Sequence, residues 1–245
     1  MTGARYLIVN ADDFGRSPGV NRGIMRTHQH GIVTSASLMV RWPAAVEAAV
    51  YARMHPTLSV GLHLDLGEWF YRNSNWDVLY QVVDLDDAFA VRQELTRQLD
   101  GFRNVMGREP SHIDSHQHLH QKQPVRTAAL EAAHQFGIPL RDCCPGVQYC
   151  GRFYGQTAEG YPYPEGISVD ALLSLLAELP KGITEIGCHP GEGQDLETMY
   201  LTEREEELKV LCDPRIASAL VELGIQLCSF NDVTSFSAAE RATQV

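Results

Sequence analysis

Short apolar segments alternate with helical patterns along almost the whole of this 245-residue chain, and this alternation restricts the fold more than any other feature. It is typical of β–α units, in which helices connect and cover the strands of a parallel sheet. We count about seven such units, with no linker and no low-complexity segment between them. One domain over residues 1–245 favours an α/β fold of the (β/α) barrel type, complete or incomplete. A flat doubly wound sheet stays open as the alternative, although no G-x-G-x-x-G follows any strand.

The expected strands are short and apolar. They cover residues 6–9, 32–40, 58–64, 111–115, 138–142, 183–188 and 225–229. Two long segments, 67–83 and 143–166, are predicted to be loops. Because the carboxyl ends of parallel strands meet at one edge, polar residues that follow these strands are expected to lie close together.

The expected helices have recognisable ends. They lie between Ser17 and Gly31, over 43–55, 84–106 and 124–136, after Ser168, and from Thr202. Ser17 is an N-cap residue before Pro18, and Gly31 ends that helix. Thr202 with Glu205 is predicted to form a capping box.

The composition excludes some classes of partner. The chain carries 31 acidic and 20 basic residues, which gives a formal net charge of −11. Such a surface repels phosphate backbones and anionic lipids, so nucleic acid and membranes are not expected as partners. No run of basic residues forms a patch for an anionic substrate.

The cellular location is expected to be cytoplasmic. The first residues, M-T-G-A-R-Y-L-I-V-N-A-D-D, do not have the apolar length of a signal peptide, and no apolar run is long enough for a membrane span. The six cysteines form no C-x-x-C pair, and we interpret them as reduced thiols. A homodimer stays open, because the sequence does not show which helix faces are exposed.

Polar side chains cluster where the predicted strands end. They are Asn10, Asp12 and Asp13; His63 and Asp65; Asp114, His116, His118 and His120; Arg141 and Asp142; and His189. In parallel α/β barrels the carboxyl edge of the sheet carries the active site. Five strands that deliver polar groups to one edge therefore predict an active site there.

The first cluster is the adjacent pair Asp12 and Asp13. Neighbouring side chains at a strand end point in different directions, so one carboxylate can bind a metal ion while the other acts as a base. The alternative is structural, because N-A-D-D-F-G is also suitable for a turn followed by a helix cap.

The second cluster is H-I-D-S-H-Q-H-L-H, which places a histidine or aspartate at every second position from His112 to His120. In an extended chain these side chains share one face, and imidazole is the commonest metal ligand. The cluster therefore predicts a metal site, against the alternative of solvated or capping histidines. His63, taken alone, is more typical of a buried core histidine, and its position on a strand between the other two clusters is what makes it a candidate. His189 ends a strand directly before a Pro-Gly turn, which suits an acid or base at this edge as well as a purely structural residue.

These motifs together resemble those of the YdjC/ChbG-type carbohydrate deacetylases. The similar segments are V-N-A-D-D-F-G, G-L-H-L, H-I-D-S-H-Q-H-L-H, G-I-P-L-R and C-H-P-G, and the resemblance runs from Tyr6 to about Val233. The family is related to the polysaccharide deacetylases and implies a distorted, seven-stranded barrel. Gln117 departs from the pattern, because the family often has a histidine at that position.

The resemblance implies a metal site. Asp13, His63 and His116 would be the ligands of one divalent ion, with His118 in reserve. A mixed nitrogen and oxygen ligand set is suited to zinc, iron, cobalt or manganese better than to magnesium, which parts of the family are described with. The ion is therefore expected to be zinc or magnesium.

The resemblance also implies catalytic roles. Asp12 would be the base, Arg141 its electrostatic partner and His189 the general acid in the hydrolysis of an N-acetyl group from an amino sugar. Two other functions stay open. A phosphoesterase of the histidine-rich barrel type would need an H-x-H after the first strand, where N-A-D-D stands here. A non-catalytic metal-binding protein would need neither Asp12 nor His189.

The two predicted loops are rich in aromatic residues. They carry Trp69, Phe70, Tyr71, Trp76 and Tyr80, and Tyr149, Phe153, Tyr154, Tyr161 and Tyr163. Aromatic faces pack against the apolar faces of sugar rings, so Trp69, Tyr71 and Tyr154 are expected to contact the substrate. The alternative is that these residues form small cores within the loops.

Overall fold

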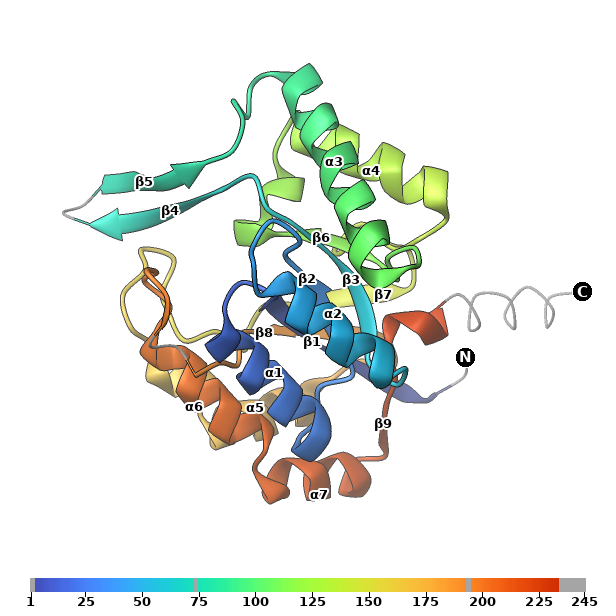
Figure 1. Cartoon of the computed structure of the whole chain (residues 1–245). Coiled ribbons are helices and arrows are strands. Elements are labelled where there is room, and N and C mark those ends of the chain that lie inside the picture. The colour runs from blue at the N-terminus through green and yellow to red at the C-terminus, as the bar shows by residue number, and fades with distance from the viewer. Residues whose placement is uncertain (1–2, 73–74, 193–194, 234–245) are drawn as a thin grey trace, which may run out of the picture.

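The computed structural model describes residues 3–72, 75–192 and 195–233, and the described chain forms an α/β fold around a curled, parallel sheet (Figure 1). Four parts of the predicted domain lie outside the described residues: 1–2, 73–74, 193–194 and 234–245. Within the described part, the sheet contains β1 (Arg5–Phe14), β2 (Ser35–Leu38), β3 (Ser59–Leu64), β6 (Ile113–Ser115), β7 (Val147–Cys150), β8 (Gly182–Cys188) and β9 (Ile225–Leu227).

The order of the strands is β6-β3-β2-β1-β8-β7, and β9 pairs with the first half of β1. All of these pairs are parallel. A closed barrel is not confirmed, because no ladder within the described residues joins β6 to β7 at the two ends of this order. The sheet is therefore a curled half-barrel.

Helices surround the sheet (Figure 1). They are α1 (Pro18–His30), α2 (Ala45–Met54), α3 (Ala88–Met106), α4 (Val125–Phe136), α5 (Val169–Glu178), α6 (Thr202–Leu211) and α7 (Pro214–Glu222), with the 3-10 helices η1 (His116–Gln121) and η2 (Pro164–Ile167). Consecutive neighbours in space are α4, α3, α2, α1 and α6. The predicted caps at Ser17 and Ser168 are confirmed, since their side chains accept hydrogen bonds from the amides of Val20 and Ala171.

The central strand β1 separates two sets of side chains. Leu7, Val9 and Ala11 belong to the main core beneath the helices, whereas Ile8 packs with Ile183 in a smaller cluster. Because side chains alternate along a strand, the residues at every second position after Ile8 continue on its face of the sheet. That face becomes polar towards the carboxyl end, at Asn10 and Asp12, where the site is found.

Five local predictions are wrong. The segment 67–83 is not a loop but contains an antiparallel hairpin, β4 (Gly67–Arg72) and β5 (Asn75–Gln81), whose aromatic and β-branched residues suit strands. The segment 143–166 contains β7, and the expected strand at 138–142 is reduced to one bridge between Ile113 and Leu140. Pro139 within that segment leaves no amide to extend a ladder.

The other two corrections concern helices. The histidine cluster does not continue as an extended chain, because η1 begins at His116 and both Gln117 and His118 have positive φ. The capping box at Thr202 is not formed; the Glu203 carboxylate accepts the hydrogen bonds of the Leu201 amide and the Thr202 hydroxyl.

Candidate active site

Most of the polar side chains predicted at the strand ends gather around one cavity at the carboxyl edge of the sheet, whereas Asp65 binds Arg41 and Asp142 binds Gln121 away from it. The cavity has a volume of about 260 Å³ and is lined among others by Asp12, Asp13, His63, His116, His118, Tyr154 and His189. Arg141 and Asp114 do not line it but contact Asp12 and His63. Residues separated by more than a hundred positions in the chain thus meet at one site.

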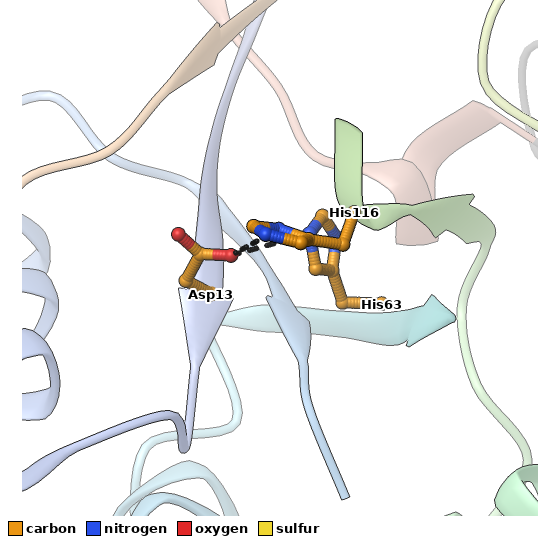
Figure 2. Close-up of side chains that lie close together, drawn as sticks. All are labelled: Asp13, His63 and His116. Atoms are coloured by element: carbon orange, nitrogen blue, oxygen red, sulfur yellow. Dashed lines mark ion pairs between the residues drawn. The ribbon is translucent and has the colours of Figure 1, made fainter. Parts of the chain in front are cut away.

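Asp13 is the centre of a potential metal site. Its buried Oδ1 lies 3.3 Å from His63 Nε2 and 3.0 Å from His116 Nδ1, and Figure 2 shows both rings directed at that oxygen. Apart from these two ion-pair contacts, Oδ1 makes no well-aligned hydrogen bond within the described residues. Three donor atoms directed at one point, with a buried carboxylate oxygen left over, fit a divalent cation.

The other oxygen of Asp13 is bound by the buried guanidinium of Arg204. Burial by itself would raise the pKa of Asp13, but the charges of Arg204 and His116 outweigh it and hold that pKa well below its usual value. Asp13 is therefore ionised, as a metal ligand must be.

Asp114 fixes the orientation of His63. Its Oδ1 lies 2.7 Å from His63 Nδ1, so the ring donates Nδ1–H to Asp114 and directs Nε2 towards Asp13. Ser37 and Arg141 bind the second oxygen of Asp114 at 2.6 and 2.8 Å. Burial opposes ionisation of His63, but the aspartates dominate and raise its pKa to about 10 when no cation is bound.

Asp12 points away from Asp13 and pairs with Arg141. The two Nη atoms of Arg141 donate to the two oxygens of Asp12 at 2.6 and 2.7 Å, which is a bidentate arrangement. Burial would raise the pKa of Asp12, yet Arg141 outweighs it and lowers that pKa. Asp12 is thus an ionised carboxylate on the cavity wall.

His189 lies on the same wall, with its Nε2 3.9 Å from Asp12 Oδ2. Its Nδ1 lies 3.7 Å from the buried carboxylate of Glu207, which also accepts the His189 amide hydrogen bond. The rings of Tyr154 and Tyr200 pack against the imidazole, at centroid distances of 5.6 and 5.1 Å. The side chain is one-fifth exposed, so it can meet a substrate from the cavity.

The remaining histidines of the 112–120 cluster do not join Asp13. His112 stacks on Phe230 in the interior, and burial lowers its pKa to about 3. His120 pairs with Ser115 at 2.7 Å. His118, the reserve ligand, lines the cavity but lies 3.3 Å from the Tyr149 hydroxyl, and burial lowers its pKa to about 4.

The aromatic residues expected to contact the substrate are divided between two surfaces. Tyr154 lines the catalytic cavity and also a neighbouring cavity of about 570 Å³, which Trp69 and Trp76 line as well. Tyr71 packs against Trp76 and Tyr161 along the hairpin and lines neither cavity. The alternative prediction, an aromatic cluster within the loops, thus describes Tyr71.

The protein-family model described as YdjC-like protein matches residues 6–222 of this chain. The chain belongs to the YdjC-like family. The resemblance drawn from the motifs is therefore confirmed.

Two relatives of this YdjC-like chain are similar over nearly their whole length. A carbohydrate deacetylase of Geobacillus stearothermophilus is 34% identical, with 93% of this chain and 98% of the relative covered. A chitooligosaccharide deacetylase of Serratia marcescens is 32% identical, with 94% and 99% covered.

One solved structure supports the fold. A protein of Enterococcus faecalis V583, provisionally described as a cellobiose-phosphate cleavage protein, superposes with a TM-score of 0.75 at 26% identity. The superposition covers 94% of this chain and 99% of the Enterococcus faecalis chain. Among the described residues of the YdjC-like chain, every helix is too short or too polar to cross a bilayer.

Sequence reasoning missed several residues that complete this YdjC-like site. Arg204 lies in T-E-R-E-E-E, which has the composition of a solvated helix face, so no local signal marks it. Glu68 was hidden in a predicted loop; it binds Arg16, and its Oε2 lies 3.7 Å from His116 Nε2. Glu185 did have a signal, because it is a charged residue within the apolar strand G-I-T-E-I-G-C.

Proposed function

We propose that this chain is a metal-dependent hydrolase that removes the acetyl group from an N-acetylated amino sugar or a short oligosaccharide of such sugars. The observation that carries the proposal is the meeting of the Asp13, His63 and His116 donor atoms with the Asp12–Arg141 pair in one cavity. The names of the relatives, carbohydrate deacetylase and chitooligosaccharide deacetylase, support the same reaction and substrate class.

Asp13, His63 and His116 would hold the ion, with two nitrogen donors and one oxygen donor. A divalent ion in this position supplies Lewis acidity, which polarises the acetyl carbonyl and makes a water molecule more acidic. The donor set favours zinc, iron, cobalt or manganese over magnesium. Asp114 and Arg204 stabilise the arrangement by fixing the His63 ring and the Asp13 carboxylate.

Asp12 is the base in this proposal. It takes a proton from the attacking water, and Arg141 keeps it ionised and fixed in position until then. His189 is the acid that gives a proton to the sugar nitrogen as the amide C–N bond breaks. The 3.9 Å between Asp12 and His189 lets one amide group lie within reach of both side chains.

The ion pairs of the cavity argue against a phosphate ester as the substrate. Arg16 and Arg204 are the arginines that line it within the described chain, and Glu68 and Asp13 already bind them. A phosphoesterase needs cations that are free to bind the phosphoryl oxygens. A neutral acetamido group makes no such demand.

The experiment is acetate release from N-acetylglucosamine, diacetylchitobiose and longer N-acetylated oligomers, with and without a chelator. We expect acetate release that a chelator abolishes and that added divalent metal restores. A His116→Ala variant, with its metal content measured, is the control for the site. Chelator-sensitive hydrolysis of phosphate esters without acetate release would overturn the proposal in favour of a phosphoesterase. Bound metal with no hydrolysis of any sugar would point to a non-catalytic metal protein.

A further inference from the structure

Asp65 directly follows β3, two residues after His63, but is not one of the proposed metal ligands Asp13, His63 and His116. It is fully buried and accepts hydrogen bonds from the indole of Trp42 at 3.0 Å and the hydroxyl of Tyr80 at 2.9 Å. Arg41 donates to it as well, at 2.9 Å. One carboxylate therefore fixes two aromatic rings, whose centroids lie 5.7 Å apart at an angle of 76°.

Trp42 and Tyr80 form one side of a cavity of about 790 Å³, a size within the range of ligand-binding pockets. Apart from Leu79 on β5, the other lining residues come from the segments that follow β1, β2 and β8, so the cavity opens at the same edge of the sheet as the proposed catalytic cavity. Arg16 lines both cavities. Neither the metal-binding group nor the residues proposed for catalysis line this second cavity within the described chain.

The surface of this cavity has a defined chemistry. The polar atoms of Trp42 and Tyr80 are used by Asp65, so the rings offer their apolar faces, although the Arg16 guanidinium lies over the Trp42 ring at 5.9 Å from its centroid. Carboxylates of the exposed residues Glu47, Asp195 and Glu197 stand at the lining. Aromatic faces with negative charge nearby attract a cation that carries apolar surface.

The buried Arg16 does not reverse this charge. Its guanidinium pairs with Glu68, and its Nη1 lies 3.8 Å from Asp13 Oδ2. Its Nε has no hydrogen-bond partner among the described residues, although the side chain is almost fully buried. Because that atom is inaccessible to solvent, it is not available to a ligand, and the ion pair with Glu68 offsets the charge that Arg16 brings to the cavity wall.

We infer that this cavity is a second carbohydrate site, which binds a protonated amino sugar. This inference rests on the proposed function, because that reaction converts a neutral acetamido group into an amine that carries a positive charge at neutral pH. The ring of such a sugar packs on Trp42 and Tyr80, and its ammonium group lies by Glu47 and Glu197. An N-acetylated sugar has the same ring without the charge, so it binds more weakly.

The test is isothermal titration of the full chain with the free-amine dimer of glucosamine and, separately, with diacetylchitobiose. Both titrations use the Asp12→Asn background to prevent turnover. The Glu47→Gln/Glu197→Gln pair removes two charges from the cavity, and Gln keeps the acceptor that Asn21 uses at Glu47. The matched control, Glu165→Gln/Glu222→Gln, removes two charges from exposed positions on η2 and α7.

We expect the first pair to weaken binding of the amine dimer about fivefold and the control pair to leave it unchanged. Raising the salt concentration from about 50 mM to about 500 mM should remove most of that difference. Equal affinity of the two variants would overturn the inference. So would a lysine oligomer that binds as tightly as the dimer with the same dependence on Glu47 and Glu197.

Acetate release separates this inference from the proposed function. It is measured for the Glu47→Gln/Glu197→Gln variant and for the unmodified chain, both of which retain Asp12. Absence of acetate from the unmodified chain would overturn the proposed reaction, whereas a charge-dependent loss of amine binding would still assign the cavity. Acetate release together with unchanged amine binding would overturn the cavity alone.

Discussion

Asp12 and Asp13 are neighbours in the chain but are bound by different arginines from distant segments. Arg141 binds Asp12, and Arg204 binds Asp13. The register of β1 with β2 shifts between Ala11 and Phe14, and Asp13 has a φ of 67°. Aspartate tolerates this left-handed conformation better than most residues, and the irregularity directs the two carboxylates to opposite tasks.

The separate tasks predict separate effects of mutation. Asp12→Asn should lower kcat by about a thousandfold while metal content stays unchanged, because Asn is no base and the ligands proposed here are Asp13, His63 and His116. The measurement is acetate release together with elemental analysis of the purified protein. The matched variant Asp13→Asn should lose metal as well. Activity retained in Asp12→Asn would remove Asp12 as the base.

Glu185 predicts a dependence of stability on pH. It is buried on β8, and its Oε1 accepts a hydrogen bond from Arg141 Nε at 2.7 Å. Burial raises its pKa from 4.5 to about 7, although Arg141 opposes that shift. Because the pKa of Glu185 is higher in the folded chain than in the unfolded chain, its protonated form stabilises the fold. This contribution to the free energy of unfolding is complete below pH 4.5 and is lost as the pH rises through about 7.

Glu185→Gln should therefore remove a pH-dependent loss of about 3 kcal/mol in the free energy of unfolding. The measurement is urea unfolding in the presence of chelator at several pH values between about 5 and 8. Gln keeps an oxygen that accepts from Arg141, so the fold should be retained. Parallel curves for the two proteins would show that Glu185 does not titrate in this range.

At the scale of elements, the β4–β5 hairpin forms a separate two-stranded sheet. It pairs only with itself among the described strands and extends from the body of the molecule (Figure 1). The side chain of Gln117 binds both the amide and the carbonyl of Trp69, at 3.0 and 2.7 Å. This side chain therefore connects the hairpin to η1, next to His116.

Gln117→Ala should release the hairpin without touching a proposed ligand. We expect KM for an oligosaccharide to rise about tenfold with a smaller change in kcat, since Trp69 would no longer be held beside the cavity. The control is Gln121→Ala, which lies on the same 3-10 helix but binds Asp142 instead. Equal kinetics of the two variants would argue against a role for the hairpin in substrate binding.

At the scale of the whole molecule, the proposed ligands connect three separate elements. Asp13 ends β1, His63 lies on β3 and His116 begins η1. These elements lie on one side of the half-barrel, where β6, β3, β2 and β1 are neighbours. A cation bound to all three would act as a cross-link of the folded chain that the unfolded chain lacks.

Metal binding should therefore stabilise the fold. At a free metal concentration about a hundredfold above Kd, the gain is about 2.7 kcal/mol, which should raise Tm by several degrees. Chelator should reverse the shift in the unmodified chain and have no effect on His116→Ala. The measurement is thermal unfolding followed by circular dichroism. An identical Tm with and without chelator would contradict a structural contribution of the metal.

The sequence alone determined the features that depend on local chemistry. Strand and helix periodicity, the caps at Ser17 and Ser168, and the motifs around Asp12, His63 and His116 all follow from short-range patterns. From these came the α/β fold, the family and the residues that the structure brings together. Strand alternation predicted only that the two aspartates have different roles, and the register shift at Asp13 sets their directions.

Only the tertiary structure decided what depends on contacts between distant segments. Within the described residues, no ladder joins β6 to β7, so the sheet forms a half-barrel. The segments predicted as loops contain β7 and the β4–β5 hairpin, because pairing with partner strands stabilises the extended conformation there. Arg204 looks like a surface residue in its own helix, yet it is buried against Asp13, 191 positions away. The choice of His116 over His118 depends on the turn at Gln117, and local spacing carries no information on either contact.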